Sequence, residues 1–153
     1  MTPDIIAYDR SDRAVLIVSV KAWAMPPEDV ARAIDRIEVP EESPPIRFLM
    51  LVDYRSIRLA HSPEVGPRAV VLDLPASSVF GHYDAEVSAL IESRGLYHPY
   101  LVGLIEAWLR DLAYRWKSPE PPGLAEIERL GLLPLLIGGT TRSGVELEPD
   151  PVH

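Results

Sequence analysis

Three residues near the beginning of the sequence, Asp4, Ser19 and Lys21, have types and spacings that could serve chemistry. Lys21 follows shortly after the apolar run Val15–Val18, and a lysine at the end of a buried strand is costly unless its charge is paired or used. Lysine is also rare here, because only Lys21 and Lys117 are lysines among the 15 basic residues. Asp4 and Lys21 are therefore candidates for a shared site.

Two strands are expected to position these side chains. The sequence predicts a strand over residues 4–9, a turn over residues 11–13 and a second strand over residues 14–22. Side chains alternate along a strand, so Ser19 and Lys21 share one face. Antiparallel pairing in this hairpin would place Asp4, an acid, beside the lysine at one edge of a sheet.

The pattern Pro3-Asp4 followed by Ser19-Val20-Lys21 resembles the PD-(D/E)XK nuclease superfamily, which is named for the acids and the lysine of its site. The core of that family is a helix, a three-stranded meander, a helix and a further strand, and the resemblance implies such a core over roughly residues 3–75. Family members commonly have a helix before the first strand, and only residues 1–2 precede the motif here, so this helix is expected either to be absent or to lie outside the given sequence. The stretches "WLRDL" and "GLLPLLIGG" resemble small uncharacterised members from cyanobacteria and related bacteria.

The resemblance implies a phosphodiesterase in which Asp4 binds Mg²⁺ and Lys21 acts on the attacking water. The family's second acid is replaced here by Ser19, a neutral and weak ligand, and two readings follow. In one, the site is degenerate and the domain is a catalytically silent binding or assembly module. In the other, it is an active endonuclease whose second acid comes from the following helix, as in some type II restriction enzymes of the superfamily. That acid would be Asp35, fourteen residues after Lys21, with Glu38 as a backup.

The rest of the chain alternates strand and helix signals. A helix is predicted over residues 27–38, with an apolar face and a polar face that carries Arg32, Asp35, Arg36 and Glu38. Further strands are predicted over residues 47–52, 56–60, 69–74 and 145–148, helices over 84–94, 99–117 and 124–130, an irregular segment over 75–82 and a turn over 138–141. This order indicates a single α/β domain over residues 1–153. The expected fold is restriction-endonuclease-like, with a mixed central sheet flanked by helices and a helical C-terminal part over roughly residues 83–132.

Arginines and tryptophans suggest possible contacts with partners. Arg55 and Arg58 flank a predicted hairpin, where they either contact phosphates or are simply solvated. Trp108 and Trp116 are spaced for one face of the 99–117 helix, which predicts either core packing or the surface of a homo-oligomer.

Composition limits the function classes. The sequence has 153 residues, no cysteine and a formal net charge of −8, so thiolate chemistry is excluded and any nucleic acid must bind through a local basic patch. No apolar run has the length of a membrane span, and no signal peptide is visible, so a cytoplasmic location without membrane contact is expected.

Overall fold

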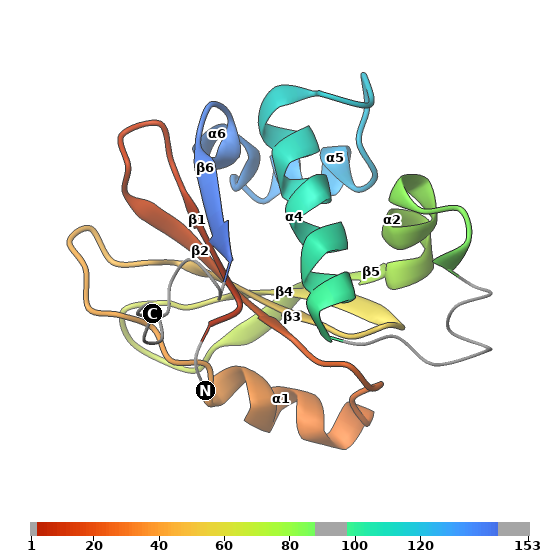
Figure 1. The fold of residues 1–153 in the computed structure, drawn as a ribbon. Helices are drawn as coiled ribbons and strands as arrows, with labels where there is room; N and C mark the ends of the chain where they lie inside the picture. Colours follow the sequence, from red (N-terminus) through yellow and green to blue (C-terminus); the bar gives the residue numbers. More distant parts are fainter. Residues whose placement is uncertain (1–2, 88–97, 144–153) are drawn as a thin grey trace, which may run out of the picture.

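Figure 1 shows the chain as a computed structural model, in which residues 3–87 and 98–143 are described. A six-stranded mixed sheet lies at the centre and helices cover both of its faces, which confirms the predicted α/β class. The strands are β1 Ile5–Tyr8, β2 Ala14–Val20, β3 Phe48–Val52, β4 Ser56–His61, β5 Ala69–Pro75 and β6 Thr140–Ser143. The helices are α1 Pro27–Asp35, α2 Ala76–Tyr83, α4 His98–Tyr114, α5 Leu124–Arg129 and α6 Leu133–Leu136.

The strands lie in the order β5-β4-β3-β2-β1-β6. β1 and β2 form the predicted hairpin, whose turn is held by Asp9, since its Oδ1 accepts hydrogen bonds from the amides of Ser11 (2.9 Å) and Arg13 (3.0 Å). β3 is parallel to β2, because α1 carries the chain back across one face before the next strand begins. β3, β4 and β5 then form an antiparallel meander.

Each face of the sheet has its own apolar core. Among the described helices, α1 alone covers one face, where Ala33 and Ile34 pack against alternate residues of β2 and β3 such as Ile17 and Leu49. The remaining helices cover the other face. Every residue of β2 is buried, as expected for a strand that is covered on both sides.

The long predicted helix is present as α4 and ends three residues early. Trp108 is fully buried, and its indole Nε1 donates a hydrogen bond to the Pro122 carbonyl at 2.8 Å. Arg115 has a positive φ of 55° and stops the helix, so Trp116 leaves the apolar stripe and is 55% exposed. The prediction that both tryptophans share one face is therefore wrong, because Trp108 packs in the core and Trp116 lies beyond the end of the helix.

Two segments predicted to lack regular structure are ordered. Residues 75–82 lie mostly within α2, because burial of Val79 and Phe80 outweighs the weak helix preference of their serine and glycine neighbours. The predicted turn over residues 138–141 runs directly into β6, which pairs with β1 in a long-range contact that local sequence does not reveal.

Gly139, which directly precedes β6, lies so close to the backbone of Tyr8 that only a glycine fits there. A Cβ atom at this position would lie 1.9 Å from the backbone oxygen of Tyr8, so no larger residue could let the two segments approach so closely.

One observed helix has no predicted counterpart, and two predicted elements cannot be fully compared. The helix without a prediction is α6. The predicted helix over residues 84–94 is described only as far as residue 87, and the predicted strand over residues 145–148 lies outside the described residues. Within the described part of the chain, no helix is long and apolar enough to cross a membrane.

Candidate functional site

Asp4 lies against the end of β2, where the sequence places it. Ile5 is opposite Val18 in the β1–β2 ladder, so Asp4 comes next, beside Ser19. The Asp4 amide donates to the Val18 carbonyl at 2.9 Å, and the Val20 amide donates to Asp4 Oδ2 at 2.6 Å. The acid therefore binds the backbone of the strand that leads to the lysine.

Ser19 and Lys21 follow one another on the face of the sheet that α1 covers. Ser19 is only 1% exposed and lies beside Leu51 in the β2–β3 register. The Lys21 amide donates to the Val52 carbonyl at 2.7 Å, which extends the pairing of β2 with β3 by one residue. The Lys21 side chain lines a groove along α1. Asp4 and Lys21 thus lie at the same end of the sheet, although β6 makes β1 an inner strand rather than an edge.

His98, the first residue of α4, is the partner of Asp4 that sequence reasoning missed. Its Nε2 lies 2.7 Å from Asp4 Oδ1. The two residues are far apart in the sequence and share no motif, so only the tertiary fold could reveal the pair. Both carboxylate oxygens of Asp4 are consequently close to nitrogen atoms.

Asp35 lies in a different part of the same face. It is the last residue of α1 and is exposed. The carbonyls of its neighbours Ile34 and Ile37 accept hydrogen bonds from Arg68 Nη1 at 2.8 and 2.9 Å. Arg68 precedes β5, which is separated from β1 by β4, β3 and β2. The contacts of Asp35 and those of Asp4 therefore lie at separate places on the sheet.

The described structure does not bring these residues together around one magnesium ion. A cation at Asp4 would compete with His98, Ser19 offers only a buried hydroxyl, and Asp35 has its contacts near β5. Glu38 is exposed and lies beyond the end of α1. In residues 3–87 and 98–143, no three histidine or acidic side chains are grouped closely enough to hold a metal ion together.

A buried ion pair, Asp53 with Arg58, was also missed. Asp53 is 1% exposed and follows β3 directly. Its Oδ1 accepts the amides of Arg55 (2.8 Å) and Ser56 (2.9 Å). Its Oδ2 accepts the Met25 amide (2.8 Å) and Arg58 Nη1 (3.2 Å). One carboxylate thus closes the β3–β4 turn and fixes the loop before α1.

Neither of the two readings given for the hairpin arginines fits Arg58. It is 9% exposed and paired with Asp53, so it is neither solvated nor placed to contact a phosphate. The strand alternation that turns it toward the α1 face explains the burial. Arg55 is exposed and lies over the ring of Tyr54, with its guanidinium carbon 5.7 Å from the ring centre.

A groove of about 280 Å³ runs between the end of β2 and α1. Its lining includes Lys21, Trp23, Met25, Asp29, Arg32 and Arg36. Three of these side chains carry positive charge and one carries negative charge. The groove is therefore a local basic surface in a chain with a formal net charge of −8.

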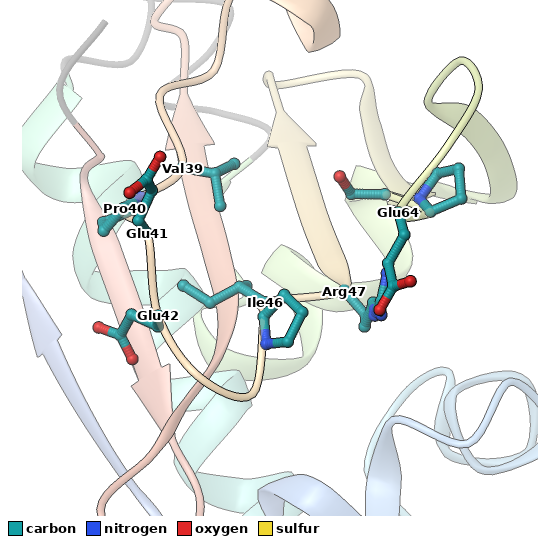
Figure 2. A pocket seen from close by; sticks show the side chains of 10 residues that line it. Val39, Pro40, Glu41, Glu42, Ile46, Arg47 and Glu64 are labelled. Atoms are coloured by element: carbon teal, nitrogen blue, oxygen red, sulfur yellow. The ribbon is translucent and has the colours of Figure 1, made fainter.

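A larger cavity of about 480 Å³ lies between residues 39–47 and residues 62–64, as Figure 2 shows. Three of its lining residues are glutamates, and its one arginine, Arg47, points at Glu64 with an Nη2–Oε1 distance of 2.6 Å. Its only cation is thus engaged by an acid. None of the residues predicted from the sequence lines this cavity.

Polar residues on the helical face are joined to one another. Asp111 is fully buried in α4 and accepts hydrogen bonds from the Tyr83 hydroxyl (2.6 Å) and from the amides of Lys117 (2.9 Å) and Ser118 (3.2 Å). Burial acts to raise the pKa of Asp111, but these hydrogen bonds outweigh it and hold the pKa below its ordinary value. Burial and the bond to Asp111 raise the pKa of the Tyr83 hydroxyl. This cluster is closed by its own partners and stabilises the junction of α2 with α4.

Comparisons of the chain with protein-family models, with curated proteins and with solved structures found no match.

Proposed function

We propose that this chain is a restriction-endonuclease-like binding module that does not itself hydrolyse nucleic acid. The observation that carries the proposal is the state of Asp4, whose two oxygens lie 2.6 Å from the Val20 amide and 2.7 Å from His98. The acid that the resemblance assigns to magnesium therefore joins β1, β2 and α4 through its contacts with the Val20 amide and the His98 ring.

Two further features support a silent site. Ser19 replaces the second acid and is buried, so it brings no charge to a metal. Asp35 is the acid that could replace it, but the backbone on either side of Asp35 is bound by Arg68, away from Asp4. Assembly into a homo-oligomer belongs to the same proposal, and light scattering of the purified protein tests it.

A nuclease assay tests the proposal directly. Plasmid and single-stranded DNA incubated with the protein and Mg²⁺ or Mn²⁺ should remain intact, and calorimetry with either metal should give no binding heat. The His98→Ala variant, which frees Asp4 Oδ1, should be equally inert. Cleavage by the wild-type protein that Lys21→Ala abolishes would overturn the proposal.

The second candidate function is a Mg²⁺-dependent DNA or RNA endonuclease. It is favoured by one observation, the placement of Asp4 beside Ser19 with Lys21 next on the same face. In that case Asp4 and Asp35 would have to come together to hold the metal, and Lys21 would act on the attacking water. This function predicts that Asp4→Asn, Asp35→Asn and Lys21→Ala each remove cleavage, whereas Asp73→Asn, at an exposed acid of β5, leaves it intact.

A further inference from the structure

The groove along α1 is built from two segments that meet side by side. Asp29 and Arg32 of α1 and Arg36, the residue that caps its C-terminal end, are spaced three and four residues apart, so they form one row along the helix. Lys21 and Trp23 come from the loop that joins β2 to this helix. A ligand in the groove would therefore meet one carboxylate and two guanidinium groups from the helix and an indole from the loop.

The arginines of the groove are available for an anion. Arg32 and Arg36 are both exposed, and within the described ranges 3–87 and 98–143 neither has an ion-pair partner. Arginine presents a planar set of N–H donors that matches a phosphate group. The acidic remainder of the chain makes this concentration of positive charge distinctive.

Trp23 is presented on a loop whose ends are fixed. It is 62% exposed, whereas Trp108 in the core is fully buried. The backbone on either side is held, because the Lys21 amide donates to Val52 and the Met25 amide donates to the buried Asp53 carboxylate. An exposed indole on an anchored loop can stack on a planar ring with little loss of conformational freedom.

We propose that this groove binds one nucleotide unit, with the base stacked on Trp23 and the phosphate held by Arg32 and Arg36. Its volume of about 280 Å³ is close to the lower limit for small-molecule sites, which suits one nucleotide and is too small for a duplex. The unit could be a free nucleotide or one nucleotide of a single strand, since both present the same base and phosphate. This inference goes beyond the proposed function, because it names a ligand and a site that do not depend on whether Asp4 binds metal.

Binding measurements on the full chain test the site. The probes are a fluorescent single-stranded oligothymidylate, followed by anisotropy, and thymidine monophosphate and inorganic phosphate, followed by calorimetry. Trp23→Ala should weaken oligonucleotide binding about five- to 150-fold, which is the usual range for losing one stacked base. Arg36→Gln should lower the slope of log affinity against log salt by about 0.7, the value for one lost phosphate contact on a single strand.

Matched controls lie on the opposite face of the sheet. Trp116→Ala removes a tryptophan that is 55% exposed, and Arg129→Gln removes an exposed arginine of α5. Neither should change the affinity or the salt dependence. Equal losses in the control variants, or no binding by the wild-type protein at low salt, would overturn the site.

The probes also separate the possible ligands. Binding of the monophosphate as tight as that of the strand assigns the groove to free nucleotides, and much tighter binding of the strand assigns it to single-stranded nucleic acid. Inorganic phosphate that binds as tightly as the monophosphate would overturn the role of Trp23. Cleavage of the oligonucleotide on adding Mg²⁺ would overturn the proposed silent module but not the proposed nucleotide site. If the protein neither binds nor cleaves the oligonucleotide, the nucleotide site is overturned and the silent module is not.

Discussion

On the face of the sheet that α2, α4, α5 and α6 cover, the buried polar groups are bound to one another, whereas on the α1 face charged side chains border a groove. Asp111 of the helical face is enclosed by Tyr83 and two backbone amides. On the α1 face, the buried Asp53 instead fixes the loop that presents Trp23. Within residues 3–87 and 98–143, four helices cover one face, whereas one helix of nine residues covers the other and leaves the groove beside it.

The largest expected effect on the free energy of unfolding comes from the face that α2, α4, α5 and α6 cover. Trp108→Ala should lower the free energy of unfolding by about 4 kcal/mol, because it empties a large buried site and leaves the Pro122 carbonyl without its indole donor. Trp116→Ala should cost less than about 1 kcal/mol, since that side chain is 55% exposed. Urea unfolding followed by circular dichroism measures both. Similar losses in the two variants would contradict the assignment of Trp108 alone to the core.

On the α1 face, the largest effect should come from Asp53. Asp53→Ala leaves Arg58 as a buried charge without its nearest acid and releases the Met25 amide, so a loss of about 3 kcal/mol is expected. The double variant Asp53→Ala/Arg58→Met should be more stable than Asp53→Ala by about 1 kcal/mol, because the stranded charge is gone. A double variant that is less stable than Asp53→Ala would mean that Arg58 contributes through other contacts.

Much of the fold could be predicted, because its signals are local. Short apolar segments bounded by turn residues indicate β1 to β5, and the spacing of Ala33, Ile34 and Ile37 indicates α1. The sequence predicts a turn over residues 138–141, where β6 begins, because four polar residues after two glycines have no strand signal until β1 pairs with them. Local patterns also missed α2, whose helix depends on the burial of Phe80.

Only the part of the candidate site that the local β1–β2 hairpin determines could be predicted from the sequence. The hairpin register brings Asp4 to Ser19, as expected. His98 and Asp53 were not found, because their partners are distant in sequence and nothing in their local spacing marks them. The groove arginines were assigned to the polar face of a helix, and only the fold shows that Trp23 lies beside them.

A smaller effect should appear at alkaline pH on the helical face. Burial, together with a hydrogen bond to Asp84, raises the pKa of Tyr100 to about 12, while a tyrosine in the unfolded chain titrates near 10. The folded state thus keeps a proton that the unfolded state loses, so this stabilisation is complete below about pH 10 and is lost as the pH rises toward about 12. Tyr100→Phe should therefore flatten the fall of the melting temperature across this window. Tyr54→Phe is the control, because the Tyr54 hydroxyl has no hydrogen-bond partner in the described residues. The same flattening in this variant would contradict the assignment of the alkaline effect to Tyr100.

The smallest effect on stability is expected in the groove itself. Trp23→Ala and Arg32→Gln/Arg36→Gln should each change the free energy of unfolding by less than about 0.5 kcal/mol, because the three side chains are exposed. Urea unfolding beside wild type measures this, with Ala33→Asp on the buried side of α1 as a variant that should fall well outside that range. A loss above about 1 kcal/mol in the groove variants would make these residues part of the packing of α1. Side chains that contribute nothing to folding, yet set the affinity for a nucleotide, would distinguish a binding surface from a solvated helix face.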